Sequence, residues 1–148
     1  MLAPLEAAIG IMAATGLSSI GAAVGIGTSG SAMAGAGTQR PEILTKALIA
    51  VVLAEAIAIY GLLSSFLLIA KLSLIVTDTT GAEALAAGAV SGLSGLAAGL
   101  GIGPTGAAMA SAAAEKPESF SKNVIAVVLA EAIAIYGLLI AFIIISKI

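Results

Sequence analysis

Four long apolar stretches make up most of the chain, and short polar segments separate them at 38–42, 78–81 and 115–118. As a helix, about thirty residues extend roughly 45 Å, which exceeds the roughly 30 Å hydrocarbon core of a bilayer. Proline is favoured in the first turn of a helix, and Pro41 and Pro117 lie where two stretches begin. The pattern predicts an all-α membrane protein with spanning helices near 4–37, 42–75, 82–114 and 118–147.

The second half of the chain repeats the first. A shift of 76 residues aligns 16–72 with 92–148 without a gap, and 33 of these 57 positions are identical. The string IAVVLAEAIAIYGLL occurs at 49–63 and again at 125–139. Internal repetition of this kind indicates repeated structural units. We therefore expect two tandem helical hairpins, the first at 1–77 and the second at 78–148.

Composition supports a membrane protein and excludes several kinds of chemistry. Apolar residues make up 60% of the chain and charged residues 9%, and the mean hydropathy is +1.20. The net charge of -2 argues against nucleic acid as a partner. Cysteine and histidine are absent, which excludes disulfides, thiol catalysis and histidine acid–base chemistry. We expect no cofactor, no metal centre and no active site on this chain; a role within a larger enzyme stays open.

Basic residues predict how the helices are oriented. No basic segment precedes the first stretch, where Glu6 lies instead, so we expect a spanning helix and not a cleaved signal peptide. The two turns between paired helices and their flanks carry Arg40, Lys46, Lys116 and Lys122, whereas the opposite side has Lys71 and Lys147. Because cytoplasmic loops are enriched in Lys and Arg, the turns are expected to be cytoplasmic and both termini outside.

Small residues recur every four positions in the first and third stretches. The series are Ser19, Ala23, Gly27, Ser31, Gly35 and Gly95, Gly99, Gly103, Ala107, Ser111. Such spacing places small side chains on one helix face and lets backbones approach closely. The expected packing glycines are Gly25, Gly27, Gly99, Gly101 and Gly103. Two interpretations stay open, namely packing within one four-helix bundle or a curved inner wall where neighbouring copies meet.

One glutamate lies in the middle of each of the second and fourth stretches, Glu55 and Glu131. Glu55 follows Glu42 by thirteen residues and precedes Lys71 by sixteen, so it lies about 20 Å and 24 Å from the polar ends. A charged group at this depth costs roughly 2.5–3.5 kcal/mol on insertion scales. Desolvation favours the neutral carboxyl form, so such a group can take up and release a proton. The alternative is a permanently protonated glutamate that bonds two helices together.

A tyrosine follows each glutamate by five residues, Tyr60 after Glu55 and Tyr136 after Glu131. Five residues rotate a helix by about 500°, which leaves the tyrosine some 140° away from its own glutamate. A contact within one helix is therefore not expected, but a contact to a neighbouring helix is open. Support for the ion site and plain interface packing are both consistent with the pattern.

Taken together, the Gly-rich first and third helices, the Arg/Lys-Pro-Glu turns and the Leu-Ala-Glu-(five)-Tyr-Gly segments resemble a known family. The chain is similar to the membrane-ring proteolipids of rotary ATPases, in the duplicated four-helix form of V-type and archaeal A-type enzymes. The resemblance implies a cylindrical homo-oligomeric ring in the membrane of a prokaryotic cell. It also implies a stator subunit that supplies an arginine, and central-stalk subunits at the cytoplasmic turns. Glu55 and Glu131 would carry the ion.

One departure concerns the number of carboxylates. Many duplicated proteolipids of V-type pumps keep the glutamate only in the fourth helix, whereas this chain also has Glu55 in the second. The resemblance then implies more ions per rotation, and each charge contributes roughly 2.3 kcal/mol per 100 mV. A higher ion-to-ATP ratio favours ATP synthesis or a reversible machine.

The ion is expected to be a proton. Sodium requires several oxygen ligands, but Ala56-Ile57 and Ala132-Ile133 follow the glutamates. Folding each hairpin about its turn brings Gly25-Ile26 and Gly101-Ile102 to the same depth, and these supply no side-chain oxygen. Sodium at Glu55 and Glu131 is the alternative, with backbone carbonyls and the tyrosines as further ligands.

Two other functions compete with a rotor ring. A small proton-coupled multidrug exporter also uses a membrane glutamate, but it needs aromatic residues for lipophilic cations, and only 3% of this chain is aromatic. A non-catalytic proteolipid pore or assembly module would not need the glutamates at all.

Overall fold

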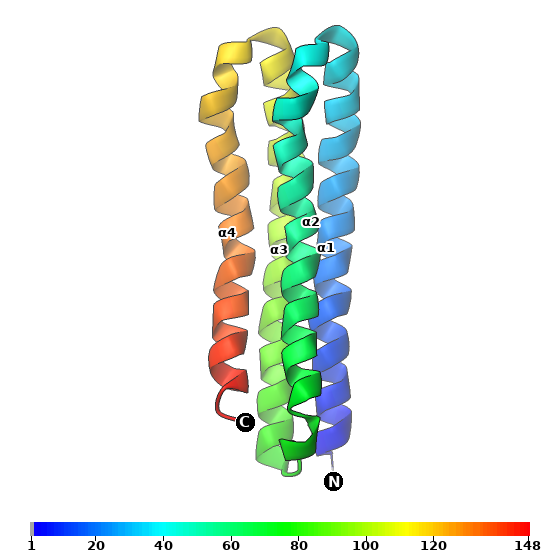
Figure 1. Ribbon diagram of the computed structural model, residues 1–148, viewed down its shortest axis with the longest axis vertical. Coiled ribbons are helices and arrows are strands. Elements are labelled where there is room, and N and C mark those ends of the chain that lie inside the picture. Colours follow the sequence, from blue (N-terminus) through cyan, green and yellow to red (C-terminus); the bar gives the residue numbers. More distant parts are fainter. Residues whose placement is uncertain (1) are drawn as a thin grey trace.

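Each apolar stretch forms one long helix in the computed structural model, which describes residues 2–148 (Figure 1). The helices are α1 (Ala3–Gln39), α2 (Leu44–Ala70), α3 (Asp78–Glu115) and α4 (Phe120–Ile145). Over these residues, all four helices are long and apolar enough to cross a membrane. The predicted all-α membrane fold of two tandem hairpins is confirmed.

The four helices run antiparallel in sequence order, with both hairpin turns at one end and both termini at the other (Figure 1). The most extensive helix contact is between α1 and α3, the first helices of the two hairpins. α2 packs on α1, on α3 and on α4, whereas α4 packs mainly on α3. The second hairpin therefore lies beside the first, and α4 is an outer edge of the bundle.

The two hairpin turns have the same construction. Pro41 begins the short 3-10 segment η1 (Pro41–Ile43), and Pro117 begins its counterpart η3 (Pro117–Ser119). In each turn the preceding basic residue closes the first helix through its backbone: the Arg40 amide donates to the Ala36 carbonyl at 2.9 Å, and the Lys116 amide to Ala112 at 2.8 Å. The proline lies where a helix amide lacks a partner in any case.

The connection between the hairpins differs from the expected one. α2 ends at Ala70 rather than 75 and is followed by the 3-10 segment η2 (Leu72–Leu74), while α3 begins at Asp78 rather than 82. Thr77 is the reason for the early start. Its hydroxyl accepts from the Thr80 amide at 3.2 Å, and the Thr80 hydroxyl accepts from the Thr77 amide at 3.1 Å. This reciprocal pair satisfies two amides that the first helical turn leaves free.

Small residues bring α1 and α3 into backbone contact. A Cβ atom at Gly99 would overlap the backbone of Gly21, and one at Gly88 would overlap the backbone of Gly10. Of the predicted packing glycines, Gly25, Gly99 and Gly103 are buried, and Gly101 would place a Cβ 3.1 Å from that of Ala130. Gly27 is different, because a Cβ atom there would have no neighbour within 4 Å among the described residues.

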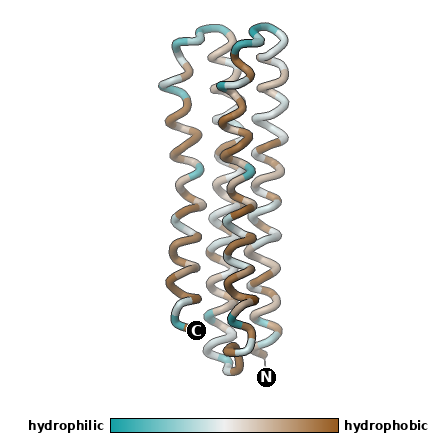
Figure 2. The backbone as a smooth tube through the Cα atoms, in the orientation of Figure 1, coloured by the Kyte–Doolittle hydropathy of each residue, from teal (hydrophilic) through white to brown (hydrophobic). Residues whose placement is uncertain are grey.

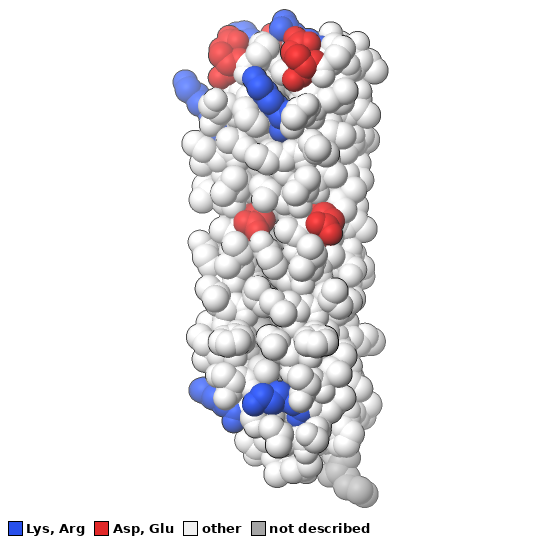
Figure 3. Space-filling view, in the orientation of Figure 1, with Lys and Arg blue, Asp and Glu red and all other residues white. Residues whose placement is uncertain are grey.

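The surface follows the expected membrane pattern. Hydrophobic residues dominate α2 and α4, whereas α1 and α3 are less hydrophobic (Figure 2). Charged side chains gather at the two ends of the visible face, and between them two acidic groups stand alone at mid-height (Figure 3). Away from the helix ends, Glu55 and Glu131 are the acidic residues of the chain.

Candidate ion-binding site

Glu131 lies in the middle of α4, on the face that packs against the rest of the bundle, and is 7% exposed. The surrounding core is apolar: it includes Ile57 on α2, Ile102 on α3 and Ala130 and Ala134 on α4 itself. A carboxyl group in such surroundings is protected from lipid and bulk water. It therefore needs a polar partner inside the protein.

Tyr60 of α2 supplies that partner. Its hydroxyl donates to the Oε1 atom of Glu131 at 2.6 Å. The bond joins the two hairpins, because Tyr60 belongs to the first and Glu131 to the second. The tyrosine thus contacts the glutamate of the other hairpin and not Glu55, which agrees with the 140° offset expected from five residues of helix.

Glu55 occupies the same position on α2 as Glu131 on α4, but its surroundings differ. It is exposed in the single chain. Its counterpart tyrosine, Tyr136, is also exposed, at 63%. Among residues 2–148 neither side chain has a hydrogen-bond partner. The structure therefore brings together one glutamate and one tyrosine of the four predicted site residues, and it leaves the other two on the surface.

In each hairpin, the glycine of the first helix that the sequence places level with the glutamate does lie beside the glutamate-bearing helix. A Cβ atom at Gly25 would lie 2.8 Å from that of Ala54, the neighbour of Glu55. A Cβ atom at Gly101 would likewise lie 3.1 Å from that of Ala130, the neighbour of Glu131. Glycine at these positions lets the inner helix approach the carboxyl-bearing helix without supplying a side-chain ligand.

The hydroxyl groups four residues after these glycines bond to their own helices. Ser29 donates to the Gly25 carbonyl and Thr105 to the Gly101 carbonyl, both at 2.7 Å. Such back-bonding to the preceding turn occupies the hydroxyl hydrogen. In the part of the chain that is described, the Tyr60 hydroxyl is the one side-chain group bonded to the Glu131 carboxyl.

A buried group of hydroxyls was not predicted from the sequence. The Ser64 and Ser91 hydroxyls are 2.7 Å apart and join α2 to α3, and the Thr15 hydroxyl donates to that of Ser65 at 2.7 Å, joining α1 to α2. Ser65 in turn donates to the Ile11 carbonyl at 2.8 Å. The consecutive serines Ser64 and Ser65 in the otherwise apolar α2 could have indicated these contacts, because buried hydroxyls in membranes bond between helices.

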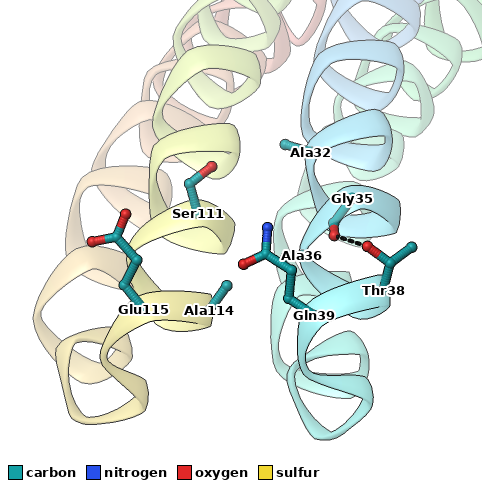
Figure 4. Close-up of a pocket in the computed structure, with 8 residues that line it drawn as sticks. All are labelled: Ala32, Gly35, Ala36, Thr38, Gln39, Ser111, Ala114 and Glu115. Atoms are coloured by element: carbon teal, nitrogen blue, oxygen red, sulfur yellow. Dashed lines mark hydrogen bonds between the residues drawn. The ribbon is translucent and has the colours of Figure 1, made fainter.

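A cavity of about 440 Å³ lies elsewhere, between the C-terminal ends of α1 and α3 (Figure 4). Gln39, Ser111 and Glu115 line it, and the Thr38 hydroxyl there donates to the Gly35 carbonyl at 2.7 Å. It is at the hairpin-turn end, about 20 Å along the helices from the glutamates by helix rise. The cavity is therefore not part of the glutamate site.

Fold and site together define a class: an integral, multi-pass membrane protein built from two copies of one hairpin, with a mid-membrane glutamate in each. The sequence pattern of the ATP synthase C subunit matches residues 9–68 and again 85–144, once in each hairpin. The chain therefore belongs to the ATP synthase C-subunit family, in a duplicated form.

Curated relatives match along most of this chain. The 16 kDa c-type proteolipid of the V-type proton ATPase of Ovis aries is 38% identical over 141 residues, which cover 95% of this chain and 91% of the relative. The c-type subunit of the V-type proton ATPase of Candida tropicalis is 38% identical over 98% of this chain and 91% of its own length. The c''-type subunit of the Saccharomyces cerevisiae enzyme is 34% identical over 94% and 69%. The expected kinship with rotary-ATPase proteolipids is confirmed.

Proposed function

We propose that this chain is the ion-carrying subunit of a homo-oligomeric rotor ring in a rotary ATPase, and that Glu55 and Glu131 carry the ion. The observation that supports this most strongly is the buried Glu131 carboxyl, which is bonded to Tyr60 at 2.6 Å in the middle of a spanning helix. A group held there by one hydroxyl can exchange a proton without dismantling the fold. The relatives named above are proteolipids of proton ATPases.

In this mechanism each glutamate crosses the lipid in its neutral form, because charge is costly there. A stator subunit with an arginine would stabilise the carboxylate as the glutamate passes, so that the proton leaves through one half-channel and another enters from the second. Rotation of the ring is then coupled to ion flow. Central-stalk subunits would attach at the hairpin turns, and the surrounding bilayer would cover the outer faces of α2 and α4.

Two ionisable groups per chain double the number of ions that each copy can carry in one turn. That arrangement favours ATP synthesis or a reversible machine, because each charge adds roughly 2.3 kcal/mol per 100 mV. The excess of basic residues at the turns supports an orientation with those turns in the cytoplasm. The named relatives are eukaryotic and lend no support to a prokaryotic cell membrane, which stays a sequence-based expectation.

The proton is favoured over sodium because few oxygen ligands are available. Sodium prefers several oxygen atoms around it. Among the described residues Tyr60 is the one side chain bonded to the Glu131 carboxyl, whereas the Ser29 and Thr105 hydroxyls are bonded to backbone carbonyls of their own helices. A proton carried on the Glu131 carboxyl needs no further ligand.

The test replaces Glu55 and Glu131 by glutamine, singly and together, in the intact ATPase complex reconstituted in liposomes. We expect each single change to abolish most proton-coupled ATP synthesis and ATP-driven proton uptake, because a site that cannot ionise beside the stator arginine obstructs a turning ring. Glu83→Gln is the matched control and should retain activity, because Glu83 lies near the start of α3 and not at mid-span. Full activity in the double variant would contradict a rotor and favour a pore or an assembly module.

A further inference from the structure

An open groove of about 390 Å³ lies on the outside of the bundle near the hairpin turns, and both α2 and α4 contribute to it. Most of its lining comes from the first two turns of α2, and the rest comes from the residue that begins α4. The lining residues are Thr45, Lys46, Leu48, Ile49, Val52 and Phe120. The proposed ion-carrying mechanism makes no use of this groove.

Lys46 is the one charged residue of the lining, and its charge is not neutralised within the chain. Its Nζ atom lies 5.9 Å from the centroid of the Phe120 ring, a distance at which a cation is attracted to an aromatic face. Among residues 2–148, Lys46 forms no ion pair with a carboxylate, and Glu42, four residues earlier, is exposed. The aromatic ring holds the ammonium group but accepts none of its three hydrogens in an ordinary bond. An anion can therefore still bind there.

The depth of Lys46 matches the boundary between lipid headgroups and hydrocarbon. It precedes Glu55 by nine residues on one helix, which is about 13.5 Å of helix rise, while half of the hydrocarbon core measures roughly 15 Å. On the visible face, basic side chains lie where the turn end meets the uncharged band of the bundle (Figure 3). The groove thus has a cation at headgroup depth.

Below that cation the groove is apolar. Leu48, Ile49 and Val52 are exposed at 43%, 40% and 52%, and they follow Lys46 along α2 toward the middle of the membrane. A phospholipid has the same order of groups along its length, with the phosphate at the boundary and the acyl chains deeper. Charge and hydrophobicity along the groove are therefore complementary to an anionic phospholipid.

The start of α2 adds to this complementarity. α2 begins at Leu44, so Lys46 and Thr45 lie in its first turn, and that turn contains no acidic residue. Free amide groups give a helix start a partial positive charge, which attracts anions. A lysine at this end is unfavourable for the isolated helix, but a bound phosphate would compensate for both charges.

We propose that this groove binds an anionic phospholipid, with the phosphate against the Lys46 ammonium group and the Thr45 hydroxyl, and with one acyl chain along Leu48, Ile49 and Val52. A net negative headgroup is favoured over a zwitterionic one because clustered basic residues attract anionic lipids. The site depends on the membrane fold and not on ion transport, so it adds a lipid ligand to the proposed function.

Native mass spectrometry of the intact assembly in mild detergent tests the ligand. Phosphatidylglycerol and phosphatidylcholine with the same acyl chains are titrated separately, and glycerol 3-phosphate is the headgroup alone. We expect phosphatidylglycerol to bind about fivefold more tightly than phosphatidylcholine, which corresponds to the roughly 1 kcal/mol contributed by one lysine near an anionic surface. Glycerol 3-phosphate should bind far more weakly. Equal binding of the two lipids, or equal binding of glycerol 3-phosphate and phosphatidylglycerol, would overturn the proposal.

Variants separate the groove from general attraction between charges. Lys46→Gln should remove the preference for phosphatidylglycerol, and Lys46→Arg should retain it. Lys116→Gln is the matched control, because it removes the same charge from the same end of the bundle but outside the groove. If both glutamine variants lose the preference equally, general charge attraction explains the binding and the groove is not a site.

A second copy of the chain is the other possible occupant of the groove, and Val52→Trp distinguishes it from lipid. The indole would fill the groove, so we expect weaker binding of both lipids and an unchanged mass of the assembly. A variant that falls apart into smaller species would show that protein covers the groove, and the lipid site would be rejected. Lys46→Gln should retain ATP-driven proton uptake, so failure of the lipid site leaves the proposed rotor intact.

Discussion

The Tyr60 hydroxyl reaches from α2 to Glu131 on α4 at 2.6 Å, so the tyrosine of the first hairpin serves the glutamate of the second. The bond ties together two helices that are otherwise joined by apolar contacts. Within one chain this pairing of a tyrosine with the glutamate of the other hairpin occurs once. Glu131 is buried beside Tyr60, whereas Glu55 is exposed.

The energetic value of this bond can be measured by a double-mutant cycle with Tyr60→Phe and Glu131→Leu, because leucine cannot accept a hydrogen bond. A hydrogen bond of this kind contributes about 1 kcal/mol, and more when one partner is charged. We expect Tyr60→Phe to lower the free energy of unfolding in mixed detergent micelles and to couple with Glu131→Leu by about that amount. Tyr60→Phe and Glu55→Leu are the control and should be additive within about 0.5 kcal/mol. Coupling of Tyr60 to Glu55 instead would contradict the pairing.

The contact of α1 with α3 predicts a sharp difference between two glycines. Gly99→Ala would place a Cβ atom against the backbone of Gly21, and such overpacking costs about 1–3 kcal/mol. Gly35→Ala adds the same atom where nothing lies within 4 Å. We expect lower thermal stability in detergent for the first variant and no loss for the second. Equal stability of the two would show that the helices can separate without cost.

Duplication and hydropathy were sufficient to predict the four helices and their pairing, because a span of about thirty apolar residues has few alternatives in a bilayer. The connection between the hairpins was misjudged, since the reciprocal bonds of Thr77 and Thr80 extend α3 to Asp78. Polar residues at a helix start and in a loop look alike in sequence. Only the capping geometry distinguishes them.

The site was predictable in part. Two glutamates at mid-span identify the titratable groups, and the 140° offset excludes a contact of each tyrosine with its own glutamate. Which neighbouring helix each tyrosine reaches depends on how the hairpins pack. A repeat in sequence cannot reveal that, because Tyr60 and Tyr136 lie in identical strings and yet differ in burial.

The hydroxyl pair of Ser64 and Ser91 provides a third prediction. Their oxygens are 2.7 Å apart between α2 and α3 in a buried position, and interhelical bonds in membranes contribute about 0.6 kcal/mol on average. Ser64→Ala and Ser91→Ala should each destabilise the bundle, and the double variant should cost less than their sum by about that amount. Ser31→Ala, an exposed serine bonded to its own helix, is the control and should have little effect. Strict additivity of the Ser64 and Ser91 changes would mean that the pair contributes nothing.

The identity of the ion gives the last prediction. The Glu131 carboxyl has the Tyr60 hydroxyl as its side-chain partner, while the Thr105 hydroxyl donates to the Gly101 carbonyl at 2.7 Å. One side-chain partner is fewer than the several oxygen ligands that a sodium ion prefers. We expect the rate of carbodiimide labelling at Glu131 to be unaffected by sodium chloride, compared with choline chloride at equal ionic strength. Slowing that depends on sodium concentration and is absent with choline would mean that backbone carbonyls complete a sodium site, and the proton assignment would then have to be replaced.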